Sequence, residues 1–178
     1  MGGVDARRLV FIDETGAKTN MTRAFGRAKK GERVVDYVPQ RHWNTTTLVA
    51  GITWESAIAP MVLDGPMDTE SFEAYVAQVL VPALPAAAIV VMDNLSAHKS
   101  ATTARLLQGV GAQLRYLPPY SPDFNPIELM WSKVKSNLKT TKARSQEHLW
   151  DAVAKALAAV TSSDTQGFFR HCFVGIIS

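Results

Sequence analysis

Short apolar runs bounded by turn-forming residues recur along the chain up to residue 117, and most are rich in β-branched side chains. Such runs are typical of β-strands. The run at residues 87–92 is apolar throughout, as in a strand covered on both faces. The predicted strands lie at residues 9–12, 34–38, 45–53, 58–63, 87–92 and 113–117. We expect the second, third and fourth to form an antiparallel meander after the first.

Apolar residues at helical spacing alternate with the later strands. One stripe, at residues 72–79, follows Asp68, a residue type that caps helix N-termini. The predicted helices lie at residues 71–80, 100–108, 126–139 and 145–160. The tail beyond them is apolar enough to pack on the body. A meander followed by alternating strands and helices predicts a mixed sheet with helices on its faces, in one domain spanning residues 1–178.

Composition excludes only a few classes of protein. The chain has 178 residues and a net charge of +3, which suits nucleic acid binding but also many metabolic enzymes. Cys172 is its one cysteine, so an intrachain disulfide and a cysteine zinc site are excluded, and a reducing, cytoplasmic compartment is expected. No apolar run is long enough to predict a membrane segment. No glycine-rich phosphate loop is present, so no nucleotide cofactor is expected.

Three carboxylates stand where strands end or a helix begins. Asp13 and Asp93 directly follow the apolar runs at 9–12 and 87–92, and Glu128 opens a predicted helix. If the two strands are adjacent and parallel, both aspartates meet at one edge of the sheet. Their charges repel unless a proton or a cation intervenes, and oxygen ligands favour Mg²⁺ or Mn²⁺. Taken singly, each acid has an alternative role as a turn, cap or helix-dipole residue.

A proline-rich loop leads into the helix that carries Glu128. Prolines 118, 119, 122 and 126 hold the backbone extended, and Asn125 is a residue type suited to cap that helix. Phosphoryl transfer depends mostly on positioning and charge neutralisation, so a stiff approach to a catalytic acid has a purpose. A generic rigid connection is the alternative for the prolines alone.

Three sequence strings carry a family resemblance: DET at 13–15, MDN at 92–94 followed by His98, and PYSPDFNPIE at 119–128 followed by Trp131. They are similar to the catalytic domain of mariner-superfamily DDE transposases, and more closely to its bacterial insertion-sequence branch. The 34 residues between the second aspartate and the glutamate match the spacing in that branch.

The resemblance implies an RNase H-like (retroviral-integrase-like) α/β fold, with a mixed five-stranded sheet flanked by helices. It implies a catalytic and metal-binding triad of Asp13, Asp93 and Glu128 that holds two Mg²⁺ ions, for which Mn²⁺ can substitute. It also implies DNA strand cleavage by water, followed by attack of the freed 3′-OH on target DNA. The expected partners are element ends and target DNA, bound by a homodimer in the bacterial nucleoid.

Basic residues supply candidate DNA contacts, each with a plainer alternative. Glu128, Ser132, Lys135, Lys139 and Lys142 recur on one helix face, which is either a phosphate-binding stripe or a solvated surface. The basic segment at 23–33 is likewise either a DNA contact or a solvated loop. His98 could face the acids, although a loop or helix-start hydrogen bond is the alternative. The candidate DNA-binding residues are Arg27, Lys29, Lys30, His98, Lys135, Lys139 and Lys142.

Two further functions stay open at this point. One is an RNase H-like nuclease that cuts without joining, and the other is a non-catalytic DNA-binding or assembly module derived from a transposase. Family members resemble a two-part chain, with helix-turn-helix modules ahead of the catalytic domain, and the residues before Leu9 are too few to form them. We therefore expect an isolated catalytic part, a second reading frame or a degenerate copy, with weak recognition of end sequences.

Overall fold

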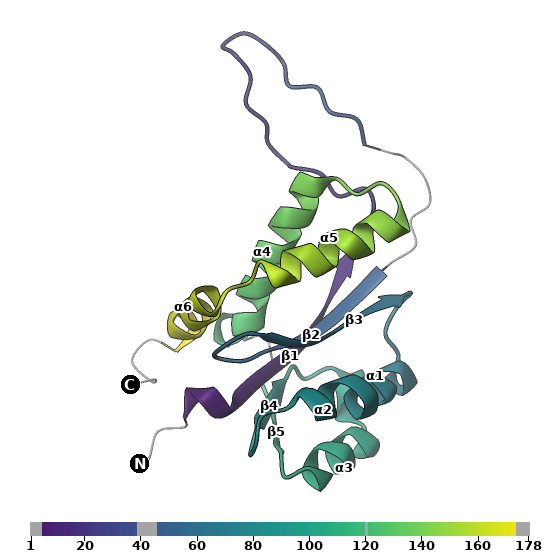
Figure 1. Ribbon diagram of the computed structural model, residues 1–178, viewed down its shortest axis with the longest axis vertical. Helices are drawn as coiled ribbons and strands as arrows, with labels where there is room; N and C mark the ends of the chain where they lie inside the picture. The colour runs from purple at the N-terminus through teal and green to yellow at the C-terminus, as the bar shows by residue number, and fades with distance from the viewer. Residues whose placement is uncertain (1–4, 39–45, 120, 174–178) are drawn as a thin grey trace.

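A five-stranded mixed sheet forms the centre of the molecule (Figure 1). The computed structural model describes residues 5–38, 46–119 and 121–173. The strand order is β3-β2-β1-β4-β5; β2 is antiparallel to both β1 and β3, and β4 is parallel to β1 and β5. The strands are β1 (Leu9–Ala17), β2 (Thr46–Ile52), β3 (Ala57–Asp64), β4 (Ile89–Met92) and β5 (Gln113–Tyr116). The predicted fold class is confirmed.

Helices cover both faces of this sheet, with α1 to α3 on one face and α4 to α6 on the other (Figure 1). The longer helices are α1 (Thr69–Tyr75), α3 (Ala101–Gly109), α4 (Pro126–Thr141), α5 (Gln146–Ala158) and α6 (Ser162–Cys172). The shorter turns are η1 (Ala6–Arg8), η2 (Val76–Leu80), α2 (Val81–Ala83), η3 (Ser96–Lys99) and η4 (Pro122–Phe124). None of the helices described here is both long and apolar enough to cross a membrane.

The alternation of side chains along β1 divides the core into two halves. Phe11 packs with α4 and α6, and its ring lies edge-on to that of Phe169, with 5.6 Å between the ring centroids. Val10 and Ile12 point to the other face, where they pack with α1 and α3. This register places Asp13 on the same face as Phe11, which is the face covered by α4.

The strand predicted at residues 34–38 is wrong. β1 already has β2 on one side and β4 on the other, so the sheet offers this segment no position beside β1. Residues 23–38 are instead exposed and lie outside any regular helix or strand. They belong to the arm, residues 18–38, which extends away from the body beyond the far end of α4 (Figure 1).

The helices differ from the prediction in two places. The helix expected at 71–80 continues to Ala83, because the wider π-type turn at η2 precedes Pro82 and relieves the clash that a proline causes in an α-helix. The chain becomes extended at Leu84, before the next proline. Phe168, Phe169 and Phe173 of the apolar tail pack on the body as expected, the first two from α6, a helix that was not predicted. The last apolar residues of that tail, Ile176 and Ile177, lie outside the described residues.

Candidate active site

The parallel pairing of β1 and β4 brings two of the predicted acids together. Its last paired residues are Ile12 and Met92, so Asp13 and Asp93 follow directly on adjacent strands. One detail of the prediction is wrong, because Asp13 lies within β1 and not beyond its end. β1 continues past β4 to pair with β2, where Asp13 lies opposite Ala50. The backbone of Asp13 is thereby held inside the sheet.

A pocket of about 360 Å³ is lined by all three predicted acids. Asp13 and Asp93 contribute from the sheet, and Glu128 contributes from the first turn of α4. The proline-rich loop forms much of the remaining wall, at residues 117–119 and 121–122. The loop thus delivers Glu128 to the pocket and also encloses part of it.

Asp13 is in an environment that opposes its negative charge. Its side chain is buried, and burial together with the charges of Glu128 and Asp93 raises its pKa to about 7. The backbone N–H of Glu14 acts in the opposite direction without offsetting these effects. A cation placed in this pocket would relieve the repulsion and favour the ionised form of Asp13.

Asp93 is ionised more readily because neighbouring groups donate to it. Burial acts against its charge, but the hydrogen bond from His98 and that from the Leu95 N–H prevail and lower its pKa. His98 Nδ1 lies 2.6 Å from Asp93 Oδ1, and Nε2 lies 2.9 Å from Glu14 Oε1. Burial disfavours the imidazolium, yet these two carboxylates raise the pKa of His98 to about 9. Glu14 points away from Asp13, as its place in an extended strand predicts.

Glu128 is the exposed member of the three acids. Asn125 occupies the N-cap position of α4 as predicted, but its side chain makes no capping hydrogen bond. Its Oδ1 is buried and has no hydrogen-bond partner within residues 5–38, 46–119 and 121–173, and the residue lines the acid pocket. Asn125 thus adds a neutral polar residue to a pocket wall that also carries the three carboxylates.

These groups suit a hard divalent cation by their chemistry. Within residues 5–38, 46–119 and 121–173, no group of three or more His, Cys, Asp or Glu side chains is arranged to hold a metal ion as it stands. The charged groups that line the pocket are nevertheless all carboxylates, which bind metals through oxygen. The most buried of them, Asp13, bears a charge that its surroundings disfavour. Carboxylate oxygens are the preferred ligands of Mg²⁺ and Mn²⁺.

The candidate DNA contacts fall into three groups. Arg27, Lys29 and Lys30 are exposed on the arm, and Lys139 is exposed on α4, where Lys135 is half-buried. Lys142 ends α4 in a left-handed conformation and pairs with Asp36, which ties the arm to the helix. The prediction of His98 as a DNA contact is wrong, because its side chain is 0% exposed; its ring nitrogens instead face the carboxylates of Asp93 and Glu14.

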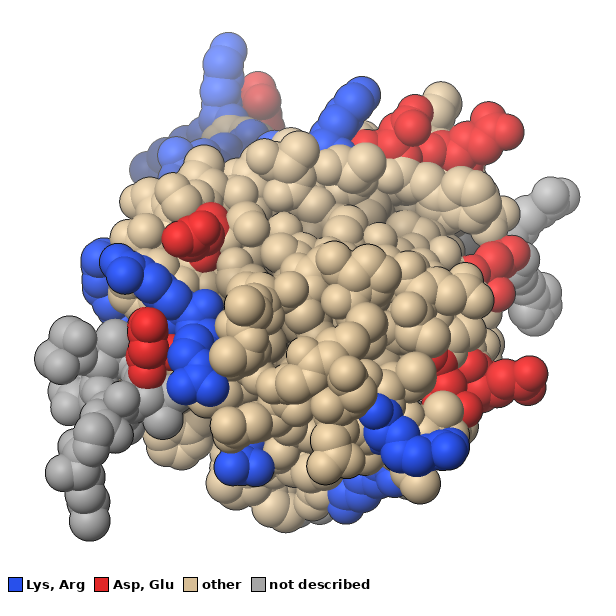
Figure 2. All heavy atoms as spheres, turned by 60° about the horizontal axis from the view of Figure 1, so that its bottom comes forward, with Lys and Arg blue, Asp and Glu red and all other residues tan. Residues whose placement is uncertain are grey.

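The end of the molecule opposite the arm shows no continuous basic surface among its described residues (Figure 2). Neutral side chains occupy the middle of this face, and basic and acidic side chains are interspersed around its edge. The arm and α4, which carry exposed basic side chains, are therefore better candidates for a nucleic acid contact than this face.

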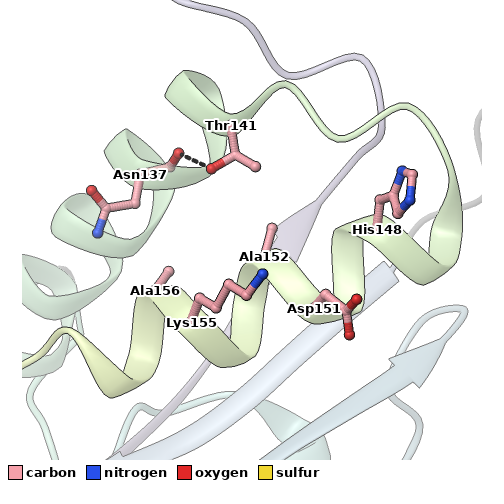
Figure 3. Close-up of a pocket in the computed structure, with 7 residues that line it drawn as sticks. All are labelled: Asn137, Thr141, His148, Asp151, Ala152, Lys155 and Ala156. Carbon is pink, nitrogen blue, oxygen red and sulfur yellow. Dashed lines mark hydrogen bonds between the residues drawn. The ribbon is translucent and has the colours of Figure 1, made fainter.

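A second hollow, of about 330 Å³, lies between α4 and α5 (Figure 3). His148, Asp151 and Lys155 contribute to its wall from α5. Across from them on α4, the Thr141 hydroxyl donates to the Asn137 carbonyl at 3.0 Å. None of the three predicted acids lines this hollow, so it is separate from the acid pocket.

Comparison with known proteins agrees with this geometry. Residues 8–150 match the family model described as DDE superfamily endonuclease. No protein of curated function matches the sequence at a significant level. The branch to which the chain belongs within the superfamily is not distinguished, so the bacterial insertion-sequence branch stays a prediction.

Solved structures of Mos1 transposase share the fold. A pre-cleavage Mos1 transpososome superposes with a TM-score of 0.76 at 16% identity, covering 94% of this chain and 53% of that chain. The catalytic domain of Mos1 mariner transposase gives 0.69 at 15% identity, with coverage of 94% and 78%. The chain thus spans about half the length of the longer Mos1 chains. The predicted RNase H-like architecture is confirmed, and the family match shows that this chain belongs to the DDE superfamily endonucleases.

Proposed function

We propose that this chain is the catalytic part of a DNA transposase, with Asp13, Asp93 and Glu128 as the acids that act on the DNA backbone. The observation that carries the proposal is the convergence of these three carboxylates, from β1, β4 and α4, on one pocket. The family match to endonucleases and the similarity in fold to Mos1 transposase support it.

The acids would hold two divalent cations, Mg²⁺ or Mn²⁺. Mos1 complexes with each of these metals have the same fold as this chain. When bound, such ions activate an attacking oxygen and stabilise the leaving oxygen of an in-line phosphoryl displacement. Asp13 and Asp93 are the ligands whose backbones the sheet fixes, since they follow directly on the last residue pair of β1 and β4.

Glu128 has a different part in this arrangement. It is exposed on the first turn of α4, and the loop before it consists largely of backbone that proline restricts. Docking of DNA over the pocket would bring a phosphate between this helix end and the sheet. We therefore assign Glu128 to complete the site, whereas the two aspartates define its position.

DNA is the proposed partner, both as an element end and as the target. Mos1 transposase has been solved as a paired-end complex with a transposon end and as a strand transfer complex. The exposed basic side chains of the arm and of α4 offer phosphate contacts here, of a kind that carries no sequence information. Engagement of two ends would require two copies of the chain, so we propose a homodimer on DNA.

A two-part assay tests this function. Incubation with duplex DNA and Mg²⁺ measures cleavage, and a pre-cut duplex with a free 3′-OH measures joining to a second duplex. The variants Asp13→Asn, Asp93→Asn and Glu128→Gln should each reduce both activities to the level of protein-free DNA. Asp151→Asn, an exposed acid of the α4–α5 hollow, should leave both unchanged.

The other outcomes separate the alternative functions. Cleavage without joining would indicate a nuclease, and DNA binding without either activity would indicate an assembly module. Metal-dependent cleavage that survives in any of the three acid variants would exclude that acid from the catalytic set.

A further inference from the structure

Asp93 is the end of a hydrogen-bonded chain that links β1 to the end of β4 through η3. Glu14 Oε1 lies 2.9 Å from His98 Nε2, and His98 Nδ1 lies 2.6 Å from Asp93 Oδ1. The three residues come from β1, from η3 and from the end of β4. Glu14 and His98 are 84 positions apart, so the contact depends on the complete fold.

The surroundings of the imidazole hold it in one place. The side chain is 0% exposed, and the ring of Phe72 lies against it at a centroid distance of 4.3 Å. The Tyr116 hydroxyl donates to the His98 carbonyl at 3.1 Å, which fixes the backbone of the same residue. A ring packed and bonded in this way has little freedom to turn, so its Nδ1 is a fixed partner for Asp93.

The consequence for Asp93 is that its two oxygens are no longer equivalent. Oδ1 is close to His98 Nδ1 and also accepts from the Leu95 N–H at 3.1 Å. None of the hydrogen bonds described for this chain uses Oδ2, while Asp93 lines the acid pocket. A carboxylate held through one oxygen presents the other in a defined direction.

We propose that Glu14 and His98 are positioning residues that orient Asp93, so that Oδ2 is the oxygen offered to the divalent cation. This inference rests on the proposed function of Asp93 as a metal ligand. Glu14 keeps the imidazole in place from behind, because without it Nε2 would be buried without an acceptor. Loss of a group that orients a metal ligand in this way commonly lowers metal affinity by about 10- to 100-fold.

Titration with Mn²⁺ by calorimetry tests the inference without any need for activity. Glu14→Ala should weaken Mn²⁺ binding by about 10-fold or more, whereas Glu14→Gln, which retains an oxygen acceptor for Nε2–H, should stay within about threefold of the wild type. Glu147→Gln removes an exposed carboxylate on α5 and serves as the matched control. Equal affinity in Glu14→Ala and wild type would overturn the proposal.

A measurement on the unaltered chain covers the case in which Glu14→Ala fails to fold. Nitrogen NMR of the histidine rings should show a change at His98 on addition of Mg²⁺, because its Nδ1 shares Asp93 with the cation. His148 and His171 are exposed and should not respond. An unchanged His98 spectrum at saturating Mg²⁺ would overturn the proposal.

Failure of this inference can be distinguished from failure of the proposed function. If Asp93→Asn binds Mn²⁺ as well as the wild type does, Asp93 is not a ligand and the proposed function itself is wrong. If Asp93→Asn weakens binding while Glu14→Ala does not, only the positioning role is lost.

Discussion

Asp13 and Glu14 are consecutive residues of β1 whose carboxylates lie on opposite faces of the sheet. Asp13 points toward α4 and lines the acid pocket, whereas Glu14 reaches His98 behind Asp93. The alternation of side chains along a strand produces this division. One dipeptide thus supplies both a proposed metal ligand and the support for another.

Replacement of Asp13 by Asn should stabilise the metal-free domain. Its pKa is raised to about 7, so the folded protein retains a proton that the unfolded chain releases above pH 3.8. The free energy of unfolding should therefore fall as the pH rises through this window, and it should do so less in Asp13→Asn. We expect a gain of about 1 to 3 kcal/mol at pH 8 in EDTA, measured by urea denaturation.

Magnesium provides the control for this experiment. It should raise the stability of the wild type at pH 8 and have a much smaller effect on Asp13→Asn, since the variant lacks the charge that the cation neutralises. A variant that is less stable than the wild type in EDTA at pH 8 would show that the Asp13 charge is not a source of strain in the metal-free pocket.

Asp164 should stabilise α6 and its contact with α4. Its carboxylate accepts from Lys133, and it forms a capping box with Thr161. These hydrogen bonds, that of Lys133 first, lower its pKa to about 2. Asp164→Ala should lower the free energy of unfolding by about 1 to 2 kcal/mol at pH 7, where the cap contributes most of the effect.

The pH dependence of this contribution has a defined sign. A lowered carboxyl pKa contributes stability that is complete above about pH 4 and is lost as the pH falls toward 2. The wild type and Asp164→Ala should therefore converge in stability in acid when thermal unfolding is followed by circular dichroism. A constant difference between pH 7 and pH 2 would contradict the assignment.

The basic side chains of the arm should contribute to DNA affinity without sequence preference. Replacement of Arg27, Lys29 and Lys30 together by Ala should weaken duplex binding and lower the slope of log K against log salt by about one to three units. Fluorescence anisotropy over a series of salt concentrations measures both effects. The exposed residues Arg105, Arg115 and Lys155 form a control set of equal charge elsewhere on the surface. An equal loss in both triple variants would assign the effect to net charge alone.

The sequence predicted the sheet and most helices because their apolar patterns are local. Two local features predicted that Asp13, Asp93 and Glu128 come together. The two aspartates each follow an apolar strand, and a proline-rich loop of distinctive sequence leads into the helix that carries Glu128. The strand at 34–38 was wrong because local β-propensity cannot show that β1 has no free edge. The Glu14–His98 contact was missed because it joins residues 84 positions apart. The capping box of Thr161 and Asp164 is a local sequence signal for the start of α6.

In the proposed function, Asp13 and Asp93 together hold a divalent cation. Crystals of the chain soaked in Mn²⁺, with diffraction collected near the manganese absorption edge, test it most directly. An anomalous peak should lie within about 2.0 to 2.3 Å of a carboxylate oxygen of each aspartate, with Glu128 able to approach from α4. Manganese bound elsewhere on the chain, with none between Asp13 and Asp93 at saturating concentration, would contradict it.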